Sequence, residues 1–330
     1  MNVTLRHLEV FCAVADHGSV TRAGEFLGLT QSAVSASLAQ LESHLEGPLF
    51  DRRGRTLRLN ERGRTLLPEA RRVLDQVSDL VNLLAGEGGD LAGEVRVGSS
   101  TTIGNYVMPF WIAAFHRRHP RVTVRQIVAN GHAIESAVLE GSLDLGFIEG
   151  PPRRSGTVAV PWLPDELVVF SGPDHPLAGA TATPDALVSP GWVMREQGSG
   201  TREVFERALR PWVPEFEVAL ELGHTEAIKR AVEAGMGIGC LSRLAVEREL
   251  GQGWLAPVHT PFLDLGRRFL RIHRKGRHVT RVLGAFWDFL QEGAGSAIPG
   301  LSPGEERRGP GSAPTPESRN GRGGTPGRRW

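Results

Sequence analysis

Two short loops carry the residue types best suited to holding a small ligand. Gly98-Ser99-Ser100-Thr101-Thr102 lies between a predicted strand and a predicted helix, and Gln197-Gly198-Ser199-Gly200-Thr201-Arg202 occupies the same kind of turn later in the chain. Free backbone N–H groups and the helix dipole gather at such turns and attract negative charge. Helix capping by Ser and Thr is the alternative for either loop alone. As a pair facing one cleft, the two loops indicate a site for a small anion.

Three further polar residues are expected near that cleft, because they stand at strand ends or helix starts: Asn130, Glu149 and Thr225. Each is as well explained by a helix cap or a hinge contact as by ligand binding. The carboxylate of Glu149 would repel an anion, so we expect it to meet an amine or a hydroxyl group of the ligand instead.

Catalysis is the competing use of the second loop. Ser199 stands between two glycines, and His224 or His175 would have to serve as its base. The G-x-S-x-G pattern of a nucleophile elbow is absent, because the glycines lie directly beside the serine. HExxH, Walker A and GxGxxG runs are absent as well. The sequence therefore predicts no catalytic residues, no metal site and no cofactor, with a hydrolase-like or purely small-molecule-binding protein as the alternative.

Length and composition limit the other possibilities. A chain of 330 residues with 40% hydrophobic and 23% charged residues predicts two or three globular domains. The net charge of +1 means that a nucleic-acid partner must be bound by a local basic patch. Cys12 and Cys240 lie far apart in apolar segments and are expected to be buried thiols, which fits a reducing compartment. We find neither a signal peptide nor an apolar run that would span a bilayer, so we expect a cytoplasmic protein without membrane contact.

The first part of the chain has the pattern of a helix-turn-helix. Helical spacing of apolar residues predicts helices over 5–17, 20–27 and 31–45, with Ser19 and Thr30 as caps of the second and third. Small polar residues lie largely off the apolar stripe of the third helix: Gln31, Ser32, Ser35 and Ser37. Short polar side chains at the start of a second helix allow it to enter a DNA major groove.

An arginine-rich hairpin follows this third helix. Residues 49–59 predict two short strands around a glycine turn, which completes a winged helix-turn-helix. Between Asp51 and Arg72 eight arginines oppose three acidic residues, a local charge of +5 that would neutralise DNA phosphates. An ordinary solvated face is the alternative for the hairpin alone.

A long helix from Asn60 predicts a dimer contact. Its apolar residues repeat at coiled-coil spacing: Leu66, Leu67, Ala70, Val73, Leu74, Val77, Leu80, Val81 and Leu84. Such a repeat predicts pairing with a second copy of the same helix. Packing of the helix on its own domain is the alternative.

The remainder alternates strands and helices, and then loses its apolar residues. Strands are predicted over 94–99, 122–129 and 143–149, and helices over 103–119 and 133–140. This rhythm predicts a parallel sheet with helices on both faces. A second set follows after Pro161-Trp162-Leu163-Pro164, with strands over 166–171, 191–195, 216–222 and 237–242 and helices over 201–210 and 226–234. A strand over 267–273 and a helix over 279–290 return to the first set, and residues 292–330 are expected to form a disordered tail.

These features together resemble the LysR-type transcriptional regulators. The match runs through the following residues: Leu5, Phe11, Ser19 to Ala23, Leu27, Gln31 to Ser35, Leu41, Glu42, Leu45, Pro48 to Phe50, Arg52, Leu59, Gly63, Leu67 and Pro68. One departure is Gly24, where the family usually has alanine, at a cost of about 1 kcal/mol in helix propensity. The pattern of the family's effector domain covers residues 94–290.

The resemblance implies an α/β protein with a winged helix-turn-helix over 1–60, a dimerisation helix over 61–89 and a two-lobed, periplasmic-binding-protein-like effector domain over 90–291. Lobe 1 would comprise 90–164 and 267–291, and lobe 2 would comprise 165–266. A one-lobed or oxyanion-sensing regulator of the molybdate type is the remaining alternative, and two α/β lobes argue against it.

The resemblance also implies the partners and the site residues. The partners would be double-stranded DNA, a second copy in a dimer, further copies in a tetramer, and RNA polymerase. DNA contacts are expected from Thr21, Arg22, Gln31, Ser32, Ser35, Ser37, Arg52, Arg53 and Arg55. Effector contacts are implied at the positions that match Ser100, Thr102 and Ser199 or Thr201. The positions at strand ends and helix starts add further expected contacts: Ser99, Thr101, Asn130, Glu149 and Thr225. Both ligand loops most resemble those of sulfur-assimilation and carbon-fixation regulators, whose effectors are small anions or phosphorylated metabolites.

Overall fold

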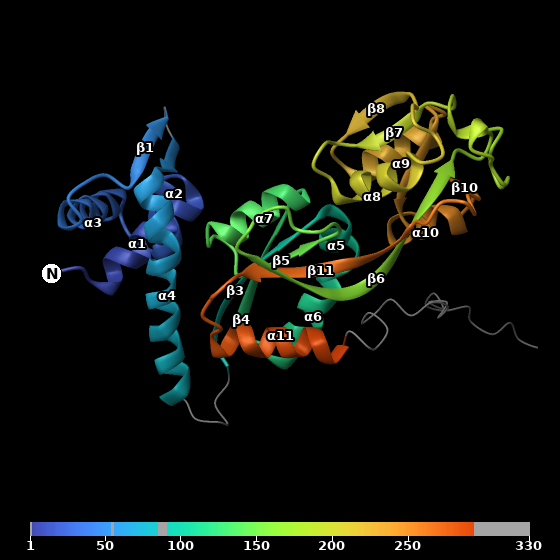
Figure 1. Cartoon of the computed structure of the whole chain (residues 1–330). Helices are drawn as coiled ribbons and strands as arrows, with labels where there is room; N and C mark the ends of the chain where they lie inside the picture. The colour runs from blue at the N-terminus through green and yellow to red at the C-terminus, as the bar shows by residue number, and fades with distance from the viewer. Residues whose placement is uncertain (1, 54–55, 85–90, 294–330) are drawn as a thin grey trace, which may run out of the picture.

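The computed structural model describes residues 2–53, 56–84 and 91–293, without the side chains of Arg53 and Leu84. Three folded units lie in a row: a small helical domain, a central α/β lobe and a second α/β lobe joined to it by two long strands (Figure 1). The turn at 54–55, the glycine run at 86–89 and residues 294–330 of the expected tail lie outside the described residues. Glu292 and Gly293, also expected in the tail, instead belong to the last helix.

The first domain confirms the predicted winged helix-turn-helix. It consists of helices α1 (Leu5–His17), α2 (Val20–Leu27) and α3 (Gln31–His44) and strands β1 (Phe50–Arg53) and β2 (Thr56–Leu59). Ser19 and Thr30 cap α2 and α3 as expected, since their hydroxyls accept from Arg22 N and Ala33 N. Gly24 is more than a weak helix former, because a Cβ there would lie 2.7 Å from Leu29 O. The turn before α3 therefore depends on this glycine.

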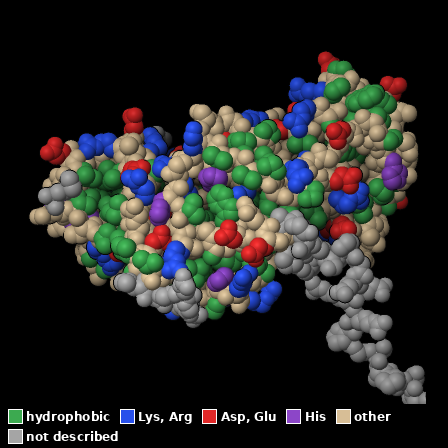
Figure 2. All heavy atoms as spheres, turned by 60° about the horizontal axis from the view of Figure 1, so that its bottom comes forward, with side chains coloured by type: hydrophobic (Ala, Val, Ile, Leu, Met, Phe, Trp, Pro, Cys, Tyr) green, Lys and Arg blue, Asp and Glu red, His purple; other side chains and the backbone are tan. Residues whose placement is uncertain are grey.

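Helix α4 (Glu61–Leu84) packs partly on its own domain. Leu67 and Ala70 are only 2% exposed and belong to the core of the first domain, with Leu66 and Leu74 packed against it. The predicted intermolecular contact is therefore wrong for the first half of the helix, where these side chains complete the small domain's core. Further along, four apolar side chains are 38–66% exposed: Val73, Leu80, Val81 and Leu83. Figure 2 shows hydrophobic side chains among Lys and Arg on the left side of the molecule.

Lobe 1 contains the predicted parallel strands. Strands β3 (Gly93–Ser99), β4 (Val122–Val128) and β5 (Leu145–Ile148) run parallel with β3 in the middle. Helix α7 (Gly131–Leu139) covers one face, and α6 (Met108–Arg118) and α11 (Arg281–Gly293) lie on the other (Figure 1). The single helix predicted over 103–119 is instead two, α5 (Thr101–Tyr106) and α6. Pro109 explains the break, because proline lacks the N–H that a continuous helix requires.

Two long strands connect the lobes. β6 (Thr157–Ser171) pairs antiparallel with β11 (Gly266–Arg274), and β11 also pairs with β5. Residues 161–164, expected to separate the two sets, lie inside β6. The continuous sheet has the order β4-β3-β5-β11-β6-β9-β7-β8, so the chain crosses between the lobes and returns as expected.

Lobe 2 contains β7 (Trp192–Arg195), α8 (Gly200–Leu209), β8 (Val218–Leu222), α9 (Thr225–Glu233) and β9 (Ile238–Ser242). The sequence did not predict helix α10 (Arg243–Gly251) or strand β10 (Ala256–Val258).

Cys12 and Cys240 are buried free thiols, as expected. Within the described residues, no helix combines the length and apolar character needed to cross a bilayer.

Candidate DNA interface and candidate effector cleft

The exposed face of α3 carries the side chains predicted to contact bases. Gln31, Ser32 and Ser35 are exposed, and Thr30 Oγ1 lies 3.0 Å from Ser32 Oγ. Thr21 and Arg22 are exposed at the start of α2. Ser37 does not share this face, because it is half-buried and its hydroxyl oxygen is inaccessible. The exposed residues of the candidate DNA-binding surface thus lie near the starts of α2 and α3.

The basic patch is smaller than the sequence suggested. Arg52 is exposed on β1, whereas the side chain of Arg53 and all of Arg55 lie outside the described part of the chain. Arg64 donates to Leu59 O at 3.0 Å and supports the hairpin. Arg71, counted in the patch, is only 3% exposed and binds Asp16 and Gly141 O. It faces lobe 1 and does not face a DNA phosphate.

In the interlobe region, four predicted hydroxyl groups are buried without a hydrogen-bond partner among the described residues. They belong to Ser99, Ser100, Ser199 and Thr225, which are at most 2% exposed. Ser100 and Ser199 precede α5 and α8, yet neither makes a side-chain cap hydrogen bond. Simple capping therefore does not explain them. Buried hydroxyls without partners cost about 1–3 kcal/mol each, which favours a ligand or ordered water at this place.

Two buried arginines, which the sequence reading missed, lie against the same loops. Arg195 at the end of β7 donates to Thr101 Oγ1 at 3.0 Å and to Glu196, and its Nη1 has no partner. Arg267 at the start of β11 donates to Thr201 Oγ1 at 3.0 Å and to Asp165 at 2.6 Å, and its Nη2 has no partner. Thr101 and Thr201 thus accept hydrogen bonds from the two arginines. Each arginine keeps one terminal nitrogen without a partner among the described residues: Nη1 of Arg195 and Nη2 of Arg267.

Asn130 and Glu149 have different roles. Asn130 caps α7, since its Oδ1 accepts from Ala133 N at 2.9 Å. Glu149 is 4% exposed and accepts from Thr102 N at 3.3 Å. A Cβ on Gly200 would lie 3.0 Å from both Glu149 Cβ and Gly150 N. The lobes therefore meet closely here, and the hollow beside this contact measures only about 20 Å³.

A second contact between the lobes lies at the far end of α5. Tyr106 donates to Glu226 Oε1 at 2.5 Å. Burial and this hydrogen bond to Glu226 raise the pKa of Tyr106 above its usual range, so the hydroxyl remains a donor. Lys229 lies 5.7 Å from the Tyr106 ring centroid and binds Glu249 at 2.8 Å.

The geometry does not support a serine nucleophile. Ser199 Oγ has no hydrogen-bond partner in the described structure, so neither His175 nor His224 acts as its base. The Nδ1 of His175 instead accepts from Leu177 N at 3.1 Å. In the same described residues, no group of His, Cys, Asp and Glu side chains is placed to hold a metal ion.

A winged helix-turn-helix, joined by a long helix to two lobes with a polar site between them, defines a DNA-binding regulator with an effector domain. Residues 5–64 match the bacterial regulatory helix-turn-helix protein model of the lysR family, and residues 88–295 match the LysR substrate binding domain. The chain belongs to the LysR family of transcriptional regulators and is not an enzyme.

Three similar proteins illustrate the range of the family. An uncharacterized HTH-type transcriptional regulator, YeiE of Escherichia coli K12, is 43% identical over 88% of this chain and 97% of its own. The RuBisCO operon transcriptional regulator of Allochromatium vinosum is 34% identical over 88% and 96%. The solved CcmR regulatory domain of Synechocystis PCC6803, in complex with 2-PG, is 31% identical and covers 61% of this chain and 96% of its own, with a TM-score of 0.57.

Proposed function

We propose that this regulator binds operator DNA as a dimer or tetramer in the cytoplasm and is switched by a small anion held between its lobes. The observation that supports an anionic ligand is a set of buried polar atoms without hydrogen-bond partners among the described residues. It comprises four hydroxyls and two arginine nitrogens: Ser99, Ser100, Ser199, Thr225, Arg195 Nη1 and Arg267 Nη2. Guanidinium N–H groups only donate, and hydroxyls can donate as well. A ligand that satisfies them must therefore be rich in acceptors, as an oxyanion is.

The arginines already have acidic neighbours, so their charge is not fully available to a ligand. Arg195 pairs with Glu196, and Arg267 pairs with Asp165. Glu149 contributes a further carboxylate near Thr102 N. Recognition of an anion would thus depend on directed hydrogen bonds more than on net charge. We infer that Glu149 either keeps its hydrogen bond with Thr102 N or accepts a hydrogen bond from a hydroxyl group of the ligand.

The close approach of the lobes favours a small ligand. The contact of Gly200 with Glu149 and Gly150 leaves little room in this arrangement. Sulfate or phosphate would need the least separation of the lobes. The complex of the CcmR regulatory domain with 2-PG supports a test of that ligand too.

A thermal-shift series with sulfate, phosphate, 2-PG and uncharged glycerol tests this proposal. We expect at least one anion to raise the unfolding temperature with a saturating dose response, and glycerol to give no saturation. The same anion should lose this effect in Ser100→Ala. A response to no anion, or an equal response of the variant, would refute the anion site.

The DNA-binding part of the proposal rests on the exposed start of α3 and the exposed apolar side chains of α4. Two copies paired through α4 would present two α3 helices to half-sites about 34 Å apart, or at a multiple of that distance. Selection from a random DNA library should then return an interrupted inverted repeat, and uniform enrichment would contradict this. A contact with RNA polymerase is proposed from family resemblance alone.

A further inference from the structure

The polar face of α4 lies along lobe 1 of the same chain. Asp75 receives a hydrogen bond from Arg277 at 3.3 Å, and Asp79 receives one from His278 at 2.9 Å. Asp79 also accepts from Arg281 N at 2.8 Å. Asn82 donates to Ala92 O at 3.0 Å. Steps of three and four residues place these groups on one side of the helix, so that side is fixed to the lobe.

Arg71 continues this face and is the place where three parts of the chain meet. Its guanidinium donates to Asp16 of α1 and to Gly141 O in the turn after α7. Only 3% of Arg71 is exposed. Gly141 has φ 74°, and a Cβ there would lie 3.0 Å from Pro68 Cβ. The turn and the helix therefore approach as closely as a glycine allows.

The charged groups beside Arg71 lie halfway along β3 and just before β5, the strands whose far ends lead to the effector loops. Asp144 accepts from Arg96 N and Arg96 Nη2 at 2.7 Å and from Arg277 at 2.6 Å. Burial alone would raise the pKa of Asp144, but Arg96 and Arg277 hold it below its usual value, so it remains charged. Arg96 lies on β3 and Asp144 directly precedes β5.

The other ends of these strands reach the effector region. β3 ends at Ser99, and β5 ends one residue before Glu149. The two strands are paired and parallel, so a shift of the strand pair would displace both of its ends together. The junction at Arg71 is thus connected to the effector loops through one pair of adjacent strands, β3 and β5.

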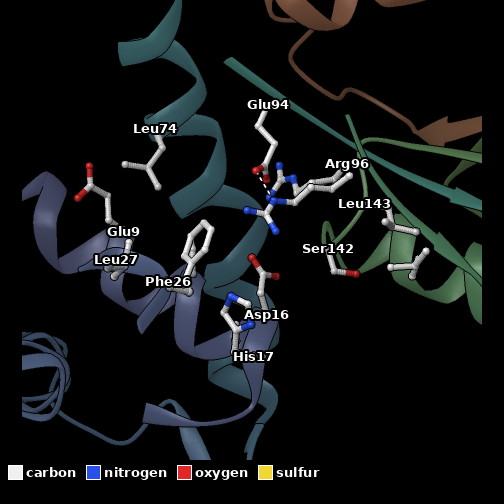
Figure 3. A pocket seen from close by; sticks show the side chains of 15 residues that line it. Glu9, Asp16, His17, Phe26, Leu27, Leu74, Glu94, Arg96, Ser142 and Leu143 are labelled. Carbon is white, nitrogen blue, oxygen red and sulfur yellow. Dashed lines mark hydrogen bonds and ion pairs between the residues drawn. The ribbon is translucent and has the colours of Figure 1, made fainter. Parts of the chain in front are cut away.

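Beside the junction, the first domain and lobe 1 are separated by a cavity of about 480 Å³ (Figure 3). Asp16, His17 and Phe26 lie on one side, and Arg96 and Leu143 lie on the other (Figure 3). Arg125 of lobe 1 lies 4.8 Å from the centre of the Phe26 ring across this space. Arg71 is therefore one of the contacts that hold the first domain against the lobe.

We propose that Arg71 is a positioning residue that couples the effector state of lobe 1 to the orientation of the DNA-binding domain. It does so by holding α1 through Asp16 and lobe 1 through Gly141 at the same time. The coupling rests on the proposed effector site, whereas the positioning of the domain does not.

Distance measurement by pulsed electron paramagnetic resonance tests the positioning. Spin labels would be attached to Ser43→Cys in the first domain and Ala113→Cys in lobe 1, which are exposed positions, while Cys12 and Cys240 are buried. Labelled protein is diluted with an excess of unlabelled protein, so that distances within one chain dominate. We expect a narrow distribution in the parent and a clearly broader one in Arg71→Met.

Arg72→Met is the matched control, because Arg72 is the next residue, its side chain is 55% exposed and its described ion pair is with Glu69 of the same helix. It should leave the distribution narrow, and Arg71→Lys should restore part of the parent's order. If Arg71→Met does not fold, Asp16→Asn removes the same ion pair at a 38% exposed site and should broaden the distribution. Equal widths in Arg71→Met and the parent, or equal broadening in Arg72→Met, would overturn the positioning role.

The coupling is tested by operator affinity with and without the anion identified by thermal shift. In the parent the two affinities should differ, and in Arg71→Met their ratio should approach one while the anion still raises the unfolding temperature. An unchanged ratio in Arg71→Met would overturn the coupling. Absence of any thermal shift in the parent would instead overturn the anion site and leave the distance result standing.

Discussion

Replacement of Ser199 by alanine should stabilise the ligand-free protein and weaken its response to ligand. Ser199 is 1% exposed and its hydroxyl has no partner among the described residues, so the folded state carries an unsatisfied polar group. Removing it should raise the free energy of unfolding by about 1 kcal/mol or more. That change corresponds to a rise in the unfolding temperature of about 2–4 °C for a domain of this size. A hydrogen bond to a charged ligand contributes about 1.5–3 kcal/mol, so anion affinity should fall about 10- to 150-fold.

Ser242→Ala provides the matched control. Ser242 is also a buried serine of lobe 2, but its hydroxyl donates to Asp165 Oδ1 at 2.6 Å and accepts from Leu244 N at 3.3 Å. Its loss should lower the unfolding temperature. Differential scanning calorimetry of both variants, with and without saturating anion, separates the two cases. If Ser199→Ala is destabilised as much as Ser242→Ala and responds to the anion like the parent, the reasoning about partnerless hydroxyls is wrong.

Three further perturbations test other parts of the structure. Arg52→Ala should weaken binding to all DNA sequences and reduce the salt slope by about 1, whereas Gln31→Ala should change base preference in a library selection. Leu80→Glu places a charge on a side chain that is 61% exposed; it should leave the fold intact and shift the sedimentation profile toward the monomer, and an unchanged profile would remove α4 from the dimer contact. Tyr106→Phe removes the hydroxyl that donates to Glu226; it should lower anion affinity severalfold by calorimetry, and equal affinity would show that this contact does not stabilise lobe closure.

Local signals predicted most of the fold. Ser19 and Thr30 identified the starts of α2 and α3, because a cap hydroxyl and the apolar spacing agree at these positions. The break between α5 and α6 was missed although Pro109 signals it, since the apolar residues keep helical spacing across the break. Residues 161–164 were read as a boundary because two prolines usually interrupt a strand, yet both lie in β6.

The hydroxyl groups of the cleft were predictable, but the arginines were not. Turns between strands and helices indicated Ser100 and Ser199 directly. Arg195 and Arg267 are far apart in sequence and are brought to the two loops only by the folding of β7 and β11. The role of Arg71 was misread for a similar reason, because a local charge count contains no information about Asp16 or Gly141. Tertiary contacts decide which arginines are available to DNA.

The most direct test of the central claim is a titration of operator binding against anion concentration, followed by fluorescence anisotropy of labelled DNA. The account predicts that operator affinity changes as the interlobe site fills, with the same half-saturation as the thermal shift. It also predicts that Ser100→Ala loses both effects together. Operator affinity that stays constant while the thermal shift reaches saturation would contradict it.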